Sequence, residues 1–330
     1  MRRVLFFFGI LFLASAALLS WFVPRAWFWT GDAGHAIAIT IHDKEFGSET
    51  GKELVRLGII DSSIGWDYYV ALFNGEGNFP KPGVYRIPAH ASYRTIVRML
   101  VLGPPRNEVK ITVPEGWTID QINASLTSYN ASIPKIVPDA LRSEYPFLAS
   151  LPKDASLEGY LFPETYFVYA DQLPQSLIVK QLDEFATRAP GIEAEAAKQG
   201  RTLRDVVILA SIIEKEVSKP EDRAIVASIF LNRLKDGMAL QSDATVNYIT
   251  HAGRARPTLD DLKADSPYNT YAYKGLPPGP ISNPGDSALL AALHPAQTDY
   301  RYFLTDDAGK TYFARTFAEH QQNRTRVYGK

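Results

Sequence analysis

The sequence predicts an α+β protein in which an N-terminal membrane helix precedes a small unit of short strands and helices and a larger, mainly helical domain. Three observations predict this fold class. An uncharged apolar run lies near the N-terminus, strand–turn–helix patterns recur between residues 36 and 126, and longer helical patterns follow from Leu157. The 330 residues leave room for two or three domains, since a domain typically has about 100–200 residues.

The apolar run, Val4–Val23, contains no charged residue. A helix of about 20 such residues spans the ~30 Å hydrocarbon core of a bilayer. Arg2 and Arg3 precede the run, and the positive-inside rule therefore places the N-terminus in the cytoplasm. Aromatic side chains, which favour the membrane interface, follow at the far end: Trp21, Trp27 and Trp29.

A cleaved signal peptide is the alternative reading of this segment, because Ala14-Ser15-Ala16 resembles a cleavage site. The apolar run continues past that site, whereas signal-peptide cores usually end after about 7–15 residues. We therefore expect an uncleaved single-pass anchor at residues 1–30 in the inner (cytoplasmic) membrane, with residues 31–330 on its outer side.

Composition excludes several classes of function. The chain has no cysteine, which rules out disulfides, thiol nucleophiles and zinc–thiolate sites. Its 35 basic and 36 acidic residues give no support for nucleic-acid binding. The six histidines lack metal-ligand spacing such as HExxH, and no P-loop, GxGxxG or GxSxG motif is present. We expect no metal and no cofactor.

Domain boundaries follow from changes in pattern. Residues 31–126 form the small N-terminal domain in this prediction. Residues 127–156 carry four scattered prolines and little periodicity, and are expected to be an irregular linker or insert. Residues 157–330 form the larger domain, and the boundary itself is confined only to the range 104–156.

One carboxyl group is predicted to lie on an apolar helix face. In the helix expected over residues 205–217, Glu216 shares a stripe with Leu209, Ile212 and Ile213, and Glu214 lies on the opposite, solvated side. Desolvation raises the pKa of such a carboxyl group, and a glutamic acid that stays protonated near neutral pH suits a general acid in glycosidic cleavage. Helix geometry alone equally allows Glu216 to reach water or to pair with Arg223 or Arg233.

Three polar loops follow this helix, at residues 241–245, 266–271 and 275–280. Their amides, hydroxyls and aromatic rings are suited to sugars, which bind by hydrogen bonds and stacking. Ordinary turns have the same composition, so the loops alone do not decide between the two readings.

Six sequence blocks occur in an order that resembles a known family. Together they closely resemble the endolytic murein transglycosylases, the YceG-like family. The blocks are LEGYLFPETY (157–166), ASIIEKE (210–216), VASIFLNRL (226–234), GMALQSDATV (237–246), SPYNTY (266–271) and GLPPGPISNPG (275–285).

The resemblance implies a LysM-like N-terminal domain and a lysozyme-like catalytic domain facing the periplasm and cell wall. It implies peptidoglycan glycan strands as substrate, cleavage that leaves 1,6-anhydro ends, and peptidoglycan polymerases as possible partners. The family's catalytic glutamate is the second glutamate of EKE, which is Glu216 here. Lower-ranked candidates for substrate binding are Gln241, Asp243, Tyr268 and Asn269.

Two positions depart from the family pattern. Ala244 stands where the family usually has proline, and Thr311 stands where it usually has histidine. Two other functions remain open: a muramidase that hydrolyses the same bond with Asp243 or Glu164 as second carboxylate, and a non-catalytic wall-binding scaffold.

Overall fold

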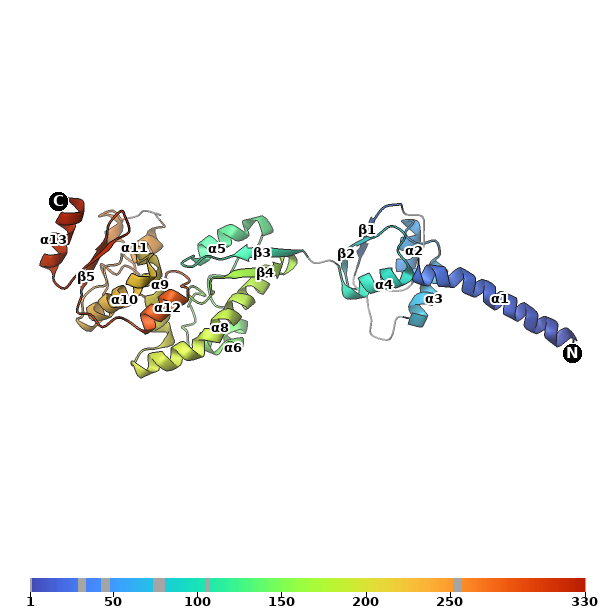
Figure 1. The fold of residues 1–330 in the computed structure, drawn as a ribbon, viewed down its shortest axis with the longest axis horizontal. Helices are drawn as coiled ribbons and strands as arrows, with labels where there is room; N and C mark the ends of the chain where they lie inside the picture. Colours follow the sequence, from blue (N-terminus) through green and yellow to red (C-terminus); the bar gives the residue numbers. More distant parts are fainter. Residues whose placement is uncertain are drawn as a thin grey trace. The chain divides into compact units, whose positions relative to one another are not determined.

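The computed structural model describes residues 2–28, 34–42, 48–73, 81–104, 107–251 and 257–329, and the side chains of these except for residues 2–14. The chain divides into two compact units, residues 1–106 and 107–330. Figure 1 shows the elements of each unit along the chain. Mixed helices and two-stranded antiparallel sheets confirm the α+β class.

The first unit is a small sheet with helices. Strands β1 (Ile37–Ile41) and β2 (Gly83–Ile87) pair antiparallel. Side chains alternate along them, so every second residue faces the core, as Ile39 and Tyr85 do. The helices of this unit are α1 (Arg2–Trp27), α2 (Ser48–Arg56), α3 (Ser63–Phe73) and α4 (Tyr93–Leu102).

The end of α1 belongs to the core of this unit. Ala26 is fully buried, Arg25 pairs with Asp61, and the Phe22 ring lies 6.4 Å from that of Tyr69. Within the part of the chain that the structure describes, no helix is long and apolar enough to cross a membrane. The predicted span is therefore not confirmed, and Trp29 and the side chains before Ser15 lie outside the described residues.

The second unit begins earlier than the sequence pattern indicates. Strand β3 (Glu108–Thr112) pairs antiparallel with β4 (Thr165–Tyr169), so residues 107–126 belong with the larger unit and not with residues 31–106. The boundary after residue 106 lies within the expected range of 104–156 but not at 126. A strand whose partner is distant in the sequence carries no local mark of its domain.

Residues 127–156 are part of the core of the second unit, which differs from the predicted linker. They form short helices, η1 (Thr127–Tyr129), α6 (Asp139–Glu144) and α7 (Pro146–Ala149). Ile133 and Leu148 are buried, and the Tyr145 hydroxyl donates to Asp183 at 2.8 Å. Irregularly spaced apolar residues anchor this segment, and they leave no helical or strand period in the sequence.

The central element of the second unit is α9 (Leu203–Glu216). A capping box joins Thr202 and Asp205 at its start, and the helix is buried along nearly its whole length. It contacts α8, α10, α11 and α12 (Figure 1). The other helices of the unit are α5 (Ile119–Leu126), η2 (Ala170–Gln172), α8 (Gln175–Lys198), α10 (Pro220–Lys235), α11 (Asp243–Thr250), η3 (Asp261–Lys263) and α12 (Asp286–Leu293).

A hairpin and a helix end the chain. Strands β5 (Tyr302–Thr305) and β6 (Thr311–Ala314) pair antiparallel, and α13 (Phe317–Tyr328) follows. Thr316 caps α13 through its side chain, which accepts from the Glu319 amide. No residue of α13 is fully buried. One face of α13 lines a pocket.

Candidate active site

Glu216 is the last residue of α9 and lies half-buried where two pockets meet. The helix ends there because Val217 takes an extended conformation. Because the body of α9 is packed on all sides, the carboxyl group at its end is held by a rigid element. Rigid support of this kind is what a catalytic side chain needs.

Two neighbours bind the same oxygen of Glu216. The Ser242 hydroxyl donates to Oε1 at 2.5 Å, and the Ala244 amide donates to Oε1 at 3.3 Å. Oε2 has no hydrogen bond to any described residue. The acid proton therefore belongs on Oε2, since Oε1 already accepts two hydrogen bonds.

The surroundings of Glu216 raise the pKa of its carboxyl group. Burial is the largest cause, and the negative charge of Asp243 acts in the same direction. Hydrogen bonds from Ser242 and Ala244 and the positive charge of Arg233 oppose the rise. Burial prevails, so Glu216 retains its proton to higher pH than an exposed glutamate.

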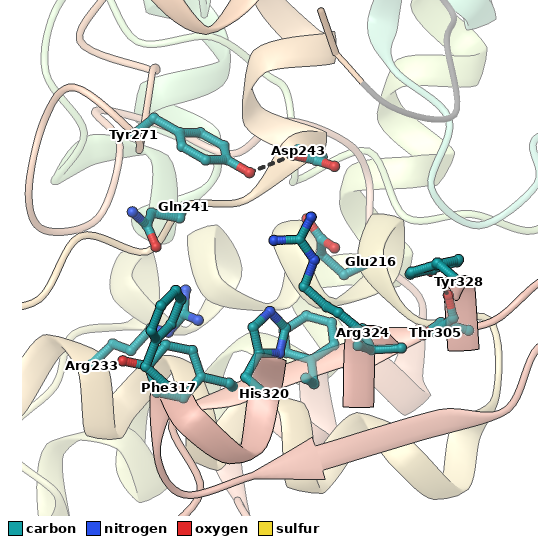
Figure 2. A pocket seen from close by; sticks show the side chains of 13 residues that line it. Glu216, Arg233, Gln241, Asp243, Tyr271, Thr305, Phe317, His320, Arg324 and Tyr328 are labelled. Atoms are coloured by element: carbon teal, nitrogen blue, oxygen red, sulfur yellow. Dashed lines mark hydrogen bonds between the residues drawn. The ribbon is translucent and has the colours of Figure 1, made fainter. Parts of the chain in front are cut away.

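The two pockets extend to either side of Glu216. One has a volume of about 450 Å³ and includes Arg233, Gln241, Tyr271 and the inner face of α13 (Figure 2). The other has a volume of about 530 Å³ and includes residues of α5 and α11, with the aromatic ring of Tyr248. Glu216 and Asp243 line both. The two pockets therefore adjoin at Glu216 and Asp243 and together form a groove.

The structure brings some of the predicted substrate-binding residues to this groove and not others. Gln241 and Asp243 line it. Tyr268 lines neither pocket and packs behind Tyr248, with ring centroids 5.3 Å apart. Asn269 is fully buried, and its amide nitrogen donates to two carbonyl groups of the preceding turn. Asn269 therefore shapes its loop and does not reach the groove.

Tyr271, which the sequence prediction passed over, lies in the groove beside Asp243. Its hydroxyl donates to the Asp243 carboxylate at 2.5 Å (Figure 2). Burial and this hydrogen bond raise the pKa of Tyr271, so the phenol remains a donor. The SPYNTY block contains both Tyr268 and Tyr271, which are partly buried alike, and no local signal shows which of the two rings lines the groove.

Other groove residues come from the C-terminal elements. His320 and Arg324 of α13 line the pocket with Arg233 of α10. The sequence pattern of the histidines bears only on metal binding, which left His320 without a predicted role. Across the described residues, no group of three or more histidine, aspartate and glutamate side chains is arranged to hold a metal ion.

Glu214 differs from its predicted place on a solvated helix face. Its side chain is 5% exposed and pairs with Arg223, which is 6% exposed, at 2.6 Å. The Gly285 amide donates to the other carboxylate oxygen at 3.1 Å. The face opposite the apolar stripe is covered by α10 and the loop before α12, which helical periodicity cannot reveal. Glu214, two residues before Glu216, therefore forms a buried ion pair with Arg223 and lines neither pocket.

A second buried carboxyl group, that of Glu158, takes part in hydrogen bonds that link distant segments of the chain. Glu158 accepts from the Ile119 amide at 3.1 Å and from the Asn283 side chain at 3.0 Å. Burial raises the pKa of Glu158 to about 8. Asn283 also accepts from the amides of Gly159 and Leu161. These bonds hold the start of α5, which lines the second pocket, against two distant loops.

The departure at Ala244 alters the donors around Glu216. The Ala244 amide is one of its two hydrogen-bond donors, and proline at this position would have no N–H. Thr311 lies opposite Thr305 in the β5–β6 hairpin, with hydroxyl oxygens 3.4 Å apart, and Thr305 lines the pocket. Ala244 thus contacts Glu216 directly, whereas Thr311 contacts a residue that lines the pocket.

Replacing Ser242 by alanine is expected to move the high-pH limb of activity to higher pH. The hydroxyl stabilises the carboxylate form of Glu216, so its loss raises the pKa of this group and keeps the acid protonated further into the alkaline range. The rate at the optimum should fall by less than about tenfold, because one hydrogen bond contributes about 0.5–1.5 kcal/mol. The pH profile of kcat/KM measures both effects. A shift of the high-pH limb to lower pH would contradict a role for the Ser242 hydroxyl in stabilising the Glu216 carboxylate.

A carboxyl group of raised pKa on a rigid helix, lining two pockets, is an arrangement typical of enzymes that use acid–base chemistry. Comparisons with known proteins identify the family. A family model described as YceG-like family matches residues 39–326. A Bacillus subtilis (strain 168) relative named endolytic murein transglycosylase is 33% identical over 307 residues, which cover 88% of this chain and 84% of the relative. The chain belongs to the YceG-like family.

Two further relatives extend the comparison. A Streptococcus pneumoniae serotype 2 (strain D39) protein, also named endolytic murein transglycosylase, is 31% identical, with 83% of this chain and 55% of the relative covered. The chain therefore spans about half the length of that relative. A crystal structure of a YceG-like protein from Listeria monocytogenes has a TM-score of 0.58 at 33% identity, covering 87% of this chain and 99% of that chain.

Proposed function

We propose that this protein is an endolytic lytic transglycosylase that cleaves the bond between N-acetylmuramic acid and N-acetylglucosamine in peptidoglycan glycan strands. The observation that carries the proposal is Glu216, a carboxyl group of raised pKa at the meeting point of two pockets. The names of the relatives support the substrate. The pockets on both sides of Glu216 support cleavage within a strand, because sugar units on either side of the cut bond would then be bound.

In the proposed reaction, Glu216 acts first as acid and then as base. Its Oε2–H protonates the glycosidic oxygen as the bond from that oxygen to C1 of the muramic acid breaks. The C6 hydroxyl oxygen of the same sugar attacks C1, and its proton passes to the Glu216 carboxylate. The product is a 1,6-anhydro end, Glu216 is protonated again, and no water is consumed.

A single carboxyl group suffices because the substrate supplies the nucleophile. Glycosidases in general use a second carboxylate to activate water or to attack the sugar. An intramolecular attack gains from proximity instead. The other carboxylate that lines both pockets, Asp243, already accepts from Tyr271, which suits it to orienting groups around Glu216.

Product analysis tests this proposal. Mass spectrometry of fragments from defined uncrosslinked glycan strands should show anhydro ends throughout, without addition of water. Hydrolysis would instead give reducing ends, one water heavier. Internal fragments early in the reaction support endolytic cleavage, and single disaccharides released from one end would contradict it.

Hydrolysis by a muramidase mechanism is the second candidate, and the position of Asp243 in both pockets favours it over a non-catalytic wall-binding scaffold. Glu164, the other carboxylate considered, is exposed and lies in neither pocket. Reducing ends that disappear in the Asp243→Asn variant would establish this candidate in place of the first.

We also infer that residues 1–30 anchor the protein in the inner membrane with its catalytic unit on the wall side, where cleavage would end elongation of nascent strands. The support is the uncharged run Val4–Val23 and the two arginines before it. Alkaline carbonate extraction of membranes should leave the full-length chain in the pellet. Release into the soluble fraction would contradict an anchor.

A further inference from the structure

One face of α13 lines the pocket on that side of Glu216. Phe317, His320, Arg324 and Tyr328 line it, and residues three and four positions apart share a helix face. Figure 2 shows His320 and Arg324 reaching into the pocket on the side of Glu216, with Asp243 and Tyr271 across it. Since α13 buries no residue fully, this face is directed to the pocket and not to the core.

The basic groups of this pocket lack carboxylate partners. Arg233 donates through Nε to the Arg301 carbonyl at 2.7 Å and through Nη1 to the Leu240 carbonyl at 2.5 Å. Its Nη2 has no hydrogen bond to a described residue, although its side chain lies within the fold with the residue only 6% exposed. Arg324 forms neither a hydrogen bond nor an ion pair with any described residue.

Some arginines of the same unit, such as Arg142 and Arg201, also bind only carbonyl or amide oxygens, whereas others are paired with carboxylates. Each of four others holds a carboxylate at 2.8 Å or less: Arg188, Arg223, Arg301 and Arg315. A buried guanidinium without an ion-pair partner is unfavourable. Burial lowers the pKa of Arg233, although the charge of the nearby Glu216 acts in the opposite direction. The unpaired positive charge in the pocket is therefore a feature that a bound anion would satisfy.

His320 adds a second, independent sign of a missing ligand. Its Nδ1 is buried and has no hydrogen-bond partner among the described residues. Burial and the charges of Arg324 and Arg233 lower the pKa of His320, so near neutral pH the ring is uncharged and can donate one hydrogen bond. The titratable or charged groups around it are Glu216 on α9, Arg233 on α10, Asp243 on α11, Tyr271 in the following loop, Tyr302 on β5, and Arg324 and Tyr328 on α13.

We propose that Arg233, His320 and Arg324 form a subsite for a carboxylate carried by the substrate, on the α13 side of Glu216. Arginine binds carboxylates through paired N–H donors, and Arg324 is an exposed residue that lines the pocket. The inference rests on the proposed function for its polymer, a glycan whose muramic acid units carry carboxylates. By this inference the enzyme selects glycan strands by the negative charge of the carboxylates that the muramic acid units carry.

Two sources supply this carboxylate, and matched substrates distinguish them. Glycan that bears peptides has its free carboxylates on the peptides, because the lactyl carboxyl group is in amide linkage. Glycan stripped of peptides by an amidase exposes the lactyl carboxylate instead. Each is compared with the same glycan after its carboxyl groups have been converted to primary amides, which removes the charge and retains the size.

The full-length protein is expected to cleave at least one carboxylate substrate with kcat/KM about 10- to 100-fold above that of its amidated form, mainly through KM. Arg324→Gln should lose this preference, with little further loss on the amidated substrate, and Arg324→Lys should retain part of it. Arg326→Gln is the matched control, because Arg326 is exposed on the same helix and lines neither pocket. It should behave as the wild type.

Equal cleavage of carboxylate and amidated substrates by the wild type would overturn the subsite, as would an equal loss on both in Arg324→Gln. Binding of the same labelled glycans to Glu216→Gln and to Glu216→Gln/Arg324→Gln measures the subsite without catalysis. Failure of the proposed function appears as absence of cleavage by the wild type. Failure of the subsite appears as binding that is indifferent to amidation.

Discussion

Replacing Glu216 by glutamine is expected to lower the rate of glycan cleavage by about 10²–10⁴-fold, because this is the usual contribution of a positioned acid–base group. Glutamine has the shape of glutamic acid and its amide oxygen can still accept from Ser242 and Ala244. Its amide nitrogen takes the place of Oε2 but cannot release a proton to the glycosidic oxygen. The rate of formation of anhydro-ended fragments measures the loss.

Folding and binding should survive this substitution, which separates a chemical role from a structural one. The melting temperature and the affinity for uncleaved glycan are the controls, and Glu164→Gln is the matched variant because Glu164 is exposed and outside the groove. Cleavage by the Glu216→Gln chain within a few-fold of wild type would remove Glu216 from the acid–base role.

The partly apolar surroundings of Glu216 could be predicted from the sequence because this residue lies within one helix. Apolar periodicity and the position of Glu216 near the helix end are local features of α9, and the structure buries this carboxyl group as the pattern indicated. The cap at Thr202 was not predicted. Helix periodicity also placed Glu214 in solvent, which is wrong because α10 and the Gly285 loop cover that face. A single helix pattern identifies the most apolar face and not the number of buried faces.

The remainder of the groove depends on contacts between distant segments. His320 and Arg324 line the same pocket as Glu216 because α13 packs on the β5–β6 hairpin, although about 100 residues of sequence separate α13 from α9. Ser242 lies in the block GMALQSDATV, but the sequence does not predict its hydrogen bond to Glu216, because the two residues are 26 positions apart. The pairing of β3 with β4, which moves the domain boundary, is equally non-local. The LysM-like character of the first unit stays a prediction.

Breaking the buried ion pair between Glu214 and Arg223 should destabilise the larger unit strongly. Arg223→Met leaves the Glu214 carboxyl group buried with the Gly285 amide as its remaining donor. Removal of one partner of a buried pair costs about 3–5 kcal/mol, which corresponds to a fall of roughly 6–20 °C in melting temperature for a unit of this size. Arg315→Met is the matched control, since the Arg315–Asp299 pair is 55% and 69% exposed and such pairs contribute at most about 1 kcal/mol.

The loss in Arg223→Met should depend on pH in a defined direction. Burial raises the pKa of Glu214 even with the arginine present, and removal of the positive charge raises it further. A carboxyl group whose pKa is higher in the folded than in the unfolded state destabilises the fold as pH rises above the unfolded value. The variant should therefore approach wild-type stability as pH falls from 7 toward 5, and the double variant Glu214→Gln/Arg223→Met should lack this dependence. Thermal unfolding of the three chains at several pH values measures the effect, and a loss in Arg223→Met no larger than that in Arg315→Met would show that the pair is not needed to hold α9 and α10 together.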